Sequence, residues 1–217
     1  MIPVLEAGGI AKSFEGTAVL SGISLSIAPG EAVGLFGANG SGKTTLVNVL
    51  SGLIAPDAGT VRFEGGDITR LPMDARFRIG ISRTFQIPRP FPDLTVRDAV
   101  RVALPASADE RAVETILSRA GILGQRHFPC ARLSQGCLRR LEFARALACR
   151  PKLMILDEVF SALSATDEEE LAALLASANR EDEAAFLLVS HNPPLLKSAC
   201  RRILYLEGGR IARERTV

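Results

Sequence analysis

Short apolar runs alternate with amphipathic stretches along most of this chain. The runs at 31–36, 152–157 and 184–190 are bounded by turn residues, and the stretches between them include segments with apolar residues at helical spacing. A continuous apolar run of this length is typical of a strand that is buried on both faces. Because such strands alternate with helices, the pattern predicts an α/β fold with a largely parallel sheet that is covered on both sides.

Turn residues divide the two ends of the chain into shorter strands. Residues 1–35 contain the β-type runs VLEAGGIAKSF, AVLSGISLSI and PGEAVGLFG, and residues 56–68 have the pattern of turn, strand and turn. At 201–214, RRILYLEGGRIARE predicts a hairpin that turns at its pair of glycines.

Residues 95–150 change to a helical pattern. TVRDAVRVAL, ADERAVETILSRAG and QGCLRRLEFARALACR have apolar residues at helical spacing, with Asp, Glu or Thr near their starts. We expect a helical subdomain here, inserted in the α/β core of a single domain that spans residues 1–217, since domains typically contain about 100–200 residues.

Composition narrows the class of protein only a little. Apolar residues make up 47% of the chain and charged residues 23%, which is an ordinary globular balance, and the net charge of +2 gives no reason to expect nucleic acid. The four cysteines form no CxxC pair, so free thiols are expected rather than a zinc site. We expect neither a signal peptide nor a bilayer span of about 20 apolar residues, so membrane contact would come through a partner.

The strongest chemical signal is GANGSGKTT at 37–45, which matches the phosphate-binding pattern G-x-x-x-x-G-K-[ST]. A predicted strand leads into it, and a predicted helix from Lys43 to about Gly52 leads out. Backbone N–H groups in such a loop point inward, and the helix N-terminus favours negative charge. Lys43 is expected to reach the β- and γ-phosphates and the Thr44 hydroxyl to bind Mg²⁺.

The alternative for this segment, a turn rich in Gly and Ser with an incidental lysine, leaves the strand–helix context unexplained. The predicted nucleotide-binding residues of the loop are Gly37, Asn39, Gly40, Ser41, Gly42, Lys43, Thr44 and Thr45.

An acidic pair follows the apolar run LMILDE at 153–158. The strand would deliver Asp157 beside the phosphate loop, where its carboxylate can hold Mg²⁺ through water. Glu158 would point elsewhere and polarise an attacking water. The alternative is an acidic pair that caps a neighbouring helix.

The motif VSHN at 189–192 places His191 at the end of another apolar strand, where it could sense the γ-phosphate. Asn192 can cap the next helix, and Pro193 and Pro194 suit its first turn. Capping explains the asparagine and the prolines but leaves the histidine unexplained; a structural role is its alternative.

Together these motifs resemble the ATP-binding subunits of ABC transporters, and the resemblance covers nearly the whole chain. It implies a P-loop NTPase fold of the ABC type, with an N-terminal antiparallel β-subdomain and a helical subdomain, and it implies ATP and Mg²⁺ as cofactors. Gln86, in RTFQIPRPF, would be the Q-loop glutamine, which touches Mg²⁺ or the attacking water and relays to the membrane partner. Phe14, in AKSFEG, would stack on adenine, unless it is an ordinary strand aromatic.

The amino-acid sequences of two segments suggest a subgroup of the ABC family. ISRTFQIPRPFPDLTVRDAV together with RRLEFARAL is most similar to the branched-chain amino acid importer group. Related ATPases that serve amides, urea or lipopolysaccharide export share much of the same sequence.

The resemblance identifies LSQGC at 133–137 as the signature, usually written L-S-G-G-Q, which binds the γ-phosphate of ATP held by a second ATP-binding subunit. Ser134 and Gly136 are kept. Cys137 replaces a glutamine that would complete a capping box, and losing its return bond should cost about 1 kcal/mol. We expect a weakened half-site; a helix start that binds no ligand is the alternative.

Two further departures concern the loop after the acidic pair. Val159 stands where the family prefers proline, and Ser164 stands where an aspartate or asparagine usually forms the D-loop. Ser164 with Asp167, or Thr166 with Glu169, can cap the helix that follows. These departures bear more on the rate of hydrolysis than on ATP binding.

We therefore expect an ATP-hydrolysing subunit on the cytoplasmic face of a cell membrane, bound to transmembrane permease subunits and paired with a second ATP-binding subunit. The predicted catalytic residues are Glu158, His191 and Gln86, and the predicted Mg²⁺ ligands are Thr44, Gln86 and Asp157. A regulatory partner with little turnover is one alternative, and a soluble non-transport ABC ATPase is another.

Overall fold

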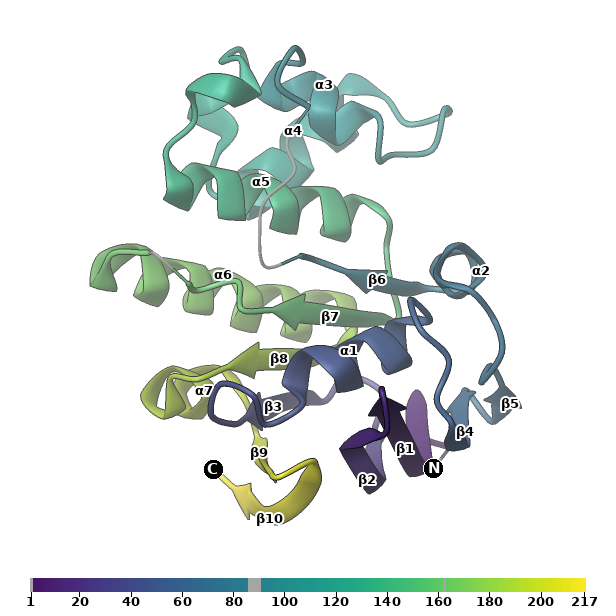
Figure 1. Ribbon diagram of the computed structural model, residues 1–217. Coiled ribbons are helices and arrows are strands. Elements are labelled where there is room, and N and C mark those ends of the chain that lie inside the picture. Colours follow the sequence, from purple (N-terminus) through teal and green to yellow (C-terminus); the bar gives the residue numbers. More distant parts are fainter. Residues whose placement is uncertain (1, 86–90, 162) are drawn as a thin grey trace.

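The strands of this protein form two sheets (Figure 1). The computed structural model describes residues 2–85, 91–161 and 163–217. A six-stranded sheet has the order β10-β9-β3-β8-β7-β6, and a four-stranded antiparallel sheet has the order β2-β1-β4-β5. Within the described residues, the edge strand β10 of the larger sheet is antiparallel to β9, and the other neighbouring strands of that sheet are parallel. The predicted parallel sheet and N-terminal antiparallel subdomain are confirmed.

Most of the elements follow the predicted pattern, but the helix at 73–78 and the strand at 81–83 were not predicted. The strands are β1 (Leu5–Phe14), β2 (Thr17–Ile27), β3 (Ala32–Phe36), β4 (Ala58–Phe63), β5 (Gly66–Asp67), β6 (Ile81–Arg83), β7 (Leu153–Asp157), β8 (Ala185–Ser190), β9 (Arg202–Glu207) and β10 (Arg210–Thr216). The helices are α1 (Lys43–Ser51), α2 (Met73–Arg78), α3 (Val96–Arg101), α4 (Glu110–Arg119), α5 (Gln135–Ala148), α6 (Ala165–Asp182) and α7 (Pro193–Ala199).

Strand β7 shows why the central runs are apolar throughout. Leu153 and Ile155 pack into one buried cluster, with α1 and the antiparallel sheet, while Met154 and Leu156 pack into another, with α5, α6 and α7. Strand β8 divides its residues between the same two clusters. Alternate side chains of a strand leave opposite faces of the sheet, so a strand with helices on both sides carries no polar position until it ends.

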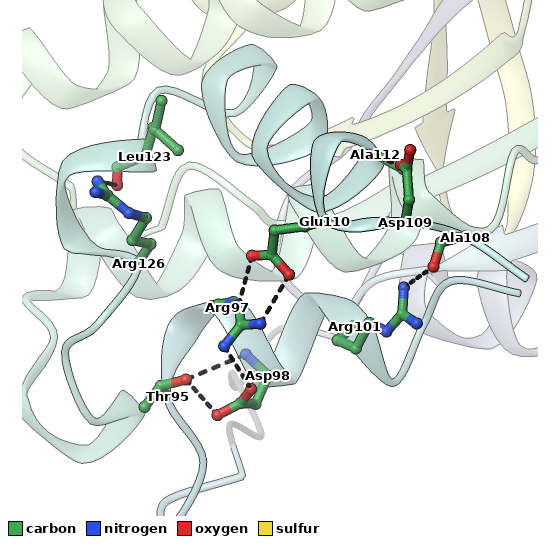
Figure 2. A network of polar contacts seen from close by, with 10 residues as sticks. All are labelled: Thr95, Arg97, Asp98, Arg101, Ala108, Asp109, Glu110, Ala112, Leu123 and Arg126. Carbon is green, nitrogen blue, oxygen red and sulfur yellow. Dashed lines mark hydrogen bonds and ion pairs between the residues drawn. The ribbon is translucent and has the colours of Figure 1, made fainter. Parts of the chain in front are cut away.

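The helices α3 and α4 are joined by a polar network (Figure 2). Arg97 donates to both carboxylate oxygens of Glu110, at 2.5 and 2.7 Å, and Arg101 donates to the carbonyl of Ala108. Thr95 and Asp109 cap α3 and α4 by accepting from backbone N–H groups. This part of the chain, which lies above the β6 edge of the sheet in Figure 1, contains the helices that were predicted within 95–150.

Helix α2 was not predicted, because its six residues carry no clear apolar period and Pro72 at its N-cap provides no side-chain hydrogen bond. Its anchor is Arg76, which is 1% exposed. The guanidinium donates to the carbonyls of Val49 and Leu50 at the end of α1. It also donates to three carbonyls of the 68–71 segment, those of Ile68, Thr69 and Leu71. Burial lowers the pKa of Arg76 to about 10, which leaves the group charged at neutral pH.

Among the described residues, none of the helices combines the length and the apolar character that a bilayer crossing requires.

We predict that Arg76→Met lowers the free energy of unfolding by about 3 kcal/mol, since several buried carbonyls then lose their donor. Urea unfolding followed by circular dichroism measures this change. The control is Arg78→Met on the same helix, which removes an exposed ion pair with Asp74 and should cost less than about 1 kcal/mol. Equal losses for the two variants would contradict the anchoring role of Arg76.

Candidate functional site

The predicted phosphate loop connects β3 to α1, as its motif requires. Gly40 and Gly42 have φ angles of +79° and +103°, which glycine adopts without the cost of a Cβ atom. A Cβ on Gly37 would lie 2.7 Å from the carbonyl oxygen of Leu206, and one on Gly42 would lie 2.9 Å from Cδ2 of Leu20. The glycines therefore allow both the turn and its tight seating against β9 and β2.

The side chains of the loop divide into an inner and an outer group. The buried Lys43 ammonium donates to the carbonyls of Gly37 and Ala38, at 2.7 and 3.1 Å, so it lies inside the curve of the loop. The buried Ser41 hydroxyl has no hydrogen-bond partner among the described residues. Asn39 and Thr44 are exposed, and Thr45 is half-buried.

This arrangement fits a bound phosphate group. The first turn of α1 carries no acidic residue, so the positive end of the helix dipole and the Lys43 charge act together on whatever occupies the loop. The exposed Thr44 hydroxyl is accessible to a cation held beside such a phosphate.

The parallel register of the sheet brings the second group of predicted residues together. Asp157 is paired with Val189 across β7 and β8, so the residues that follow the two strands meet at one edge. Nδ1 of His191 lies 3.0 Å from Oε2 of Glu158. The His191 side chain is 62% exposed and that of Glu158 is 11% exposed.

The backbone of Glu158 is held in the left-handed region, with φ of +50°. Its N–H donates to the carbonyl of Val189 at 3.0 Å, and its carbonyl accepts from the N–H of Ser161 at 3.0 Å. A non-glycine residue in this region costs of order 1 kcal/mol or more and persists only where its surroundings fix it, which is common at functional sites. The Glu158 carboxylate lies beside His191, whereas the carboxylate of the adjacent Asp157 pairs with a different residue.

That residue is Arg83, which was not among the predicted site residues. Its guanidinium lies 2.9 Å from Oδ2 of Asp157, with both side chains nearly buried, and it donates to Oδ1 of Asn48 at 2.7 Å and Oγ of Ser51 at 3.0 Å. The hydroxyl of Thr84 accepts from the N–H of Asp157. Arg83 therefore connects the helix of the phosphate loop to the strand of the acidic pair. The polar pair Arg83–Thr84 at the end of a buried strand was the available signal.

The predicted signature forms the start of α5. Ser134 is exposed and accepts from the N–H of Cys137 at 3.2 Å, which is the half of the capping box that does not depend on residue 137. Gly136 is buried, and a Cβ on it would lie 2.7 Å from Oδ1 of Asp167 at the start of α6. Gly136 thus has a packing role within its own chain. The contact predicted for Ser134 and Gly136 would be with ATP bound to a second subunit, and therefore not within this chain.

The remaining predictions have mixed outcomes. Ser164 caps α6 together with Asp167, as predicted, and Val159 is buried in the core. Asn192 occupies the N-cap of α7, but the prediction that its side chain caps the helix is wrong, because no such hydrogen bond forms. Instead, the Asn192 N–H donates to the hydroxyl of Ser190, which closes the tight turn after β8.

Two residues that the family resemblance singled out remain. Phe14 is 46% exposed at the end of β1, and the ammonium of Lys12 lies 5.6 Å from its ring centroid. This exposure shows that Phe14 is not a core aromatic. It belongs to the same sheet as β2, the strand whose Leu20 lies against the phosphate loop. Gln86 lies outside the described residues.

Comparisons with known proteins agree with this arrangement. The family model described as ABC transporter matches residues 20–161. The chain is 38% identical to the lipoprotein-releasing system ATP-binding protein LolD 1 of Caulobacter vibrioides, over 97% of this chain and 95% of that protein. It is 35% identical to the lipopolysaccharide export system ATP-binding protein LptB of Acidithiobacillus ferridurans, over 97% and 89%. It is 33% identical to the methionine import ATP-binding protein MetN of Brucella abortus, over 98% of this chain but 59% of that protein.

Solved structures resemble the whole fold. The ADP conformation of MJ1267, an ATP-binding cassette of an ABC transporter, has a TM-score of 0.90 and 26% identity, over 100% of this chain and 92% of that chain. A dimeric post-hydrolysis state of the ATP-binding cassette MJ0796, bound to ADP and Pi, has a TM-score of 0.86 and 25% identity, over 98% of each chain. The chain belongs to the ABC transporter family. Within that family it is an ATP-binding subunit with the ABC-type ATPase fold.

The packing of Gly136 predicts that the effect of Gly136→Ala on the free energy of unfolding depends on the presence of Asp167. Gly136→Ala should lower the free energy of unfolding by about 1–2 kcal/mol, because overpacking against the Asp167 carboxylate outweighs the gain in helix propensity. In an Asp167→Ala background the same substitution should be neutral or stabilising. Urea unfolding of the wild type, the two single variants and the double variant measures the coupling. Identical effects in the two backgrounds would show that the contact does not constrain residue 136.

Proposed function

We propose that this chain is the ATP-hydrolysing subunit of a membrane transport complex, and that residues 1–217 act as one ATP-binding domain. The observation that supports this most directly is the convergence of three elements at one edge of the sheet. The phosphate loop, Asp157 and the Glu158–His191 pair all follow the carboxyl ends of parallel strands, where α/β folds bind their ligands.

In this proposal the phosphate loop holds the triphosphate of ATP. The backbone of residues 37–42 and the dipole of α1 would bind the phosphate oxygens, with the Lys43 ammonium released from two loop carbonyls to the β- and γ-phosphates. Asn39, Ser41 and Thr45 would complete the loop, and Phe14 would stack on adenine. Thr44 and, through water, Asp157 would hold Mg²⁺, whose charge neutralises the phosphate oxygens as the bond to the γ-phosphate breaks.

Glu158 would be the general base. Its carboxylate is nearly buried, lies 3.0 Å from Nδ1 of His191, and belongs to a turn that fixes its backbone. A base in such a position can take a proton from a water that attacks the γ-phosphate. The largely exposed His191 would orient Glu158 and contact the γ-phosphate.

A second ATP-binding subunit would close the site. Ser134 is exposed at the N-terminus of α5, so its hydroxyl and the adjacent N–H groups can contact a γ-phosphate bound to the other subunit. The dimeric state of the similar cassette MJ0796 supports this proposal. Binding of ATP would bring the subunits together head to tail, and loss of the γ-phosphate would let them separate.

A permease would bind at the helical part of the chain and hold it at the cytoplasmic face of a membrane. A cavity of about 430 Å³ lies between α2, the end of β6 and the helices α3 and α5. Exposed apolar side chains, Phe77 and Val102, line it beside Arg83 and Glu142. The cavity is thus lined by the residue that pairs with Asp157 and by a residue of α5.

For the solute, we propose a branched-chain amino acid or a related small molecule that is imported. The support is the similarity of the segments around RTFQIPRPF and RRLEFARAL to that importer group. Relatives named for lipoprotein release, methionine import and lipopolysaccharide export share a similar degree of identity. The permease determines the solute, and its co-purification from membranes would identify the transport complex.

A second candidate function is a weakly active partner in a heterodimer. Cys137 is its main support, because a thiol at the third residue of α5 replaces the glutamine of the family signature. Val159 and Ser164 also depart from the family pattern. However, both residues have structural roles in this chain: Val159 is buried in the core, and Ser164 caps α6.

We predict that Glu158→Gln retains ATP and accumulates ATP-bound dimer, while phosphate release falls by about 100-fold or more, since the general base is lost. Phosphate release and size-exclusion chromatography in ATP and Mg²⁺ measure the two effects. The matched control is Glu114→Gln, an exposed position on α4, which should behave like the wild type. Unchanged release from the Glu158 variant would refute the assignment of the base.

Cys137→Gln distinguishes the two candidate functions. If this chain hydrolyses ATP at a weakened half-site, restoring the capping box should raise the ATPase rate by about fivefold, which corresponds to about 1 kcal/mol. Steady-state ATPase assays at rising protein concentration measure the gain. No gain would mean that residue 137 does not limit turnover, and the control Cys149→Gln, distant from the signature, should give none.

A further inference from the structure

Arg139 is a buried charged residue that the proposed mechanism does not yet use. It lies on α5, two residues after Cys137, and its side chain is 4% exposed. A buried guanidinium is costly to desolvate unless hydrogen bonds and an opposite charge compensate it. The hydrogen-bond partners of Arg139 therefore identify the segments of the protein that it connects.

The partners come from different segments of the chain. Nη1 of Arg139 donates to the carbonyl of Phe85, at 3.1 Å, and to Oε2 of Glu142, at 3.3 Å. Nη2 donates to the hydroxyl of Ser161 at 2.9 Å. Phe85 lies just after β6, two residues from the Arg83 that pairs with Asp157. Ser161 lies at the end of the turn that begins at Glu158. Glu142 lies on α5 itself and supplies the compensating charge.

The bond to Ser161 reaches the predicted base through one further hydrogen bond. The Ser161 N–H donates to the Glu158 carbonyl at 3.0 Å and so closes the turn in which Glu158 has a φ of +50°. A turn with a left-handed residue needs support from outside, because the residue gains by relaxing. Arg139 provides a polar support at the end of the turn that is opposite to the bond between the Glu158 N–H and Val189.

We propose that Arg139 is a positioning residue for hydrolysis: it links the signature helix α5 to the turn that holds Glu158, so that Glu158 is correctly placed only while α5 is docked. The inference rests on the proposed ATPase function. An arginine suits this role because one planar group with several donors can reach Phe85, Ser161 and Glu142 at once, which a lysine cannot. Movement of α5 would then change the placement of the base without changing the phosphate loop.

A purely structural role predicts something different. Val159 and Phe160 already anchor the turn in the core, at 4% and 3% exposure, so the fold of the segment does not depend on Arg139 alone. If Arg139 only contributed to stability, its loss would lower nucleotide affinity and turnover together or leave both unchanged. A positioning role separates the two quantities.

The test uses the full chain with Arg139→Met, Ser161→Ala and the double variant. We expect kcat for ATP to fall by about 10- to 100-fold in Arg139→Met, because misplacement of a catalytic group is costly, while the Kd of a fluorescent ATP analogue changes by less than about twofold. Ser161→Ala should lower kcat by about fivefold, and the double variant should be no slower than Arg139→Met, since both remove the same link.

Hydrogen exchange supplies a readout that does not depend on activity. The Ser161 amide should exchange faster in Arg139→Met than in the wild type, as a turn that has lost its support opens more often. The matched controls are Arg78→Met on α2 and Ser177→Ala on α6, which should change neither kcat nor exchange at Ser161.

The outcomes separate the inference from the proposed function. If the ATP hydrolysis of the wild type did not depend on Glu158, the proposed function would be refuted. Amide exchange at Ser161 would still decide whether Arg139 supports the turn of Glu158. A kcat for Arg139→Met within twofold of the wild type, a parallel loss of ATP affinity, or unchanged exchange would overturn the role of Arg139.

Discussion

The ion pair between Arg83 and Asp157 is the interaction on which the arrangement of the site depends. Two buried charges are expensive to desolvate, and the cost is met here because the guanidinium also bonds to Asn48 and Ser51 of α1. The pair therefore fixes the distance between the helix that follows the phosphate loop and the strand that carries the acidic residues. Arg139 reaches Phe85, two residues further along, so the helical part of the chain is connected to the same point.

Much of the fold followed from the sequence because the signals were local or periodic. The apolar runs that became β3, β7 and β8 are buried on both faces, and this is the condition that removes polar residues from a strand. The caps of α3, α4, α5 and α6 were visible as Thr95, Asp109, Ser134 and Ser164. The phosphate loop needed only its glycines, its lysine and the strand and helix around it.

Other features could not be predicted, because they join residues that are distant in the sequence. Arg76 stabilises a helix that has no period of its own by bonding to carbonyls of α1, and nothing near residue 76 indicates those partners. Gly136 matched the family signature, but its contact with Asp167 depends on how α5 crosses the start of α6. The side chain of Asn192 illustrates the opposite error, since a residue type that commonly caps helices stands at the cap and makes no such bond.

The seating of the phosphate loop also has a consequence for how the protein folds during synthesis. The loop occupies residues 37–42, yet the atoms that confine it include the Leu206 carbonyl and the Gly209 N–H, which bonds to the carbonyl of Ser41. Strand β3, which precedes the loop, has β8 and β9 as its neighbours. Domains of a growing chain fold only when the segments that pair with each other have left the ribosome. The nucleotide pocket therefore cannot form before residues 206–209 have been made, and ATP can stabilise the nascent chain only after that point.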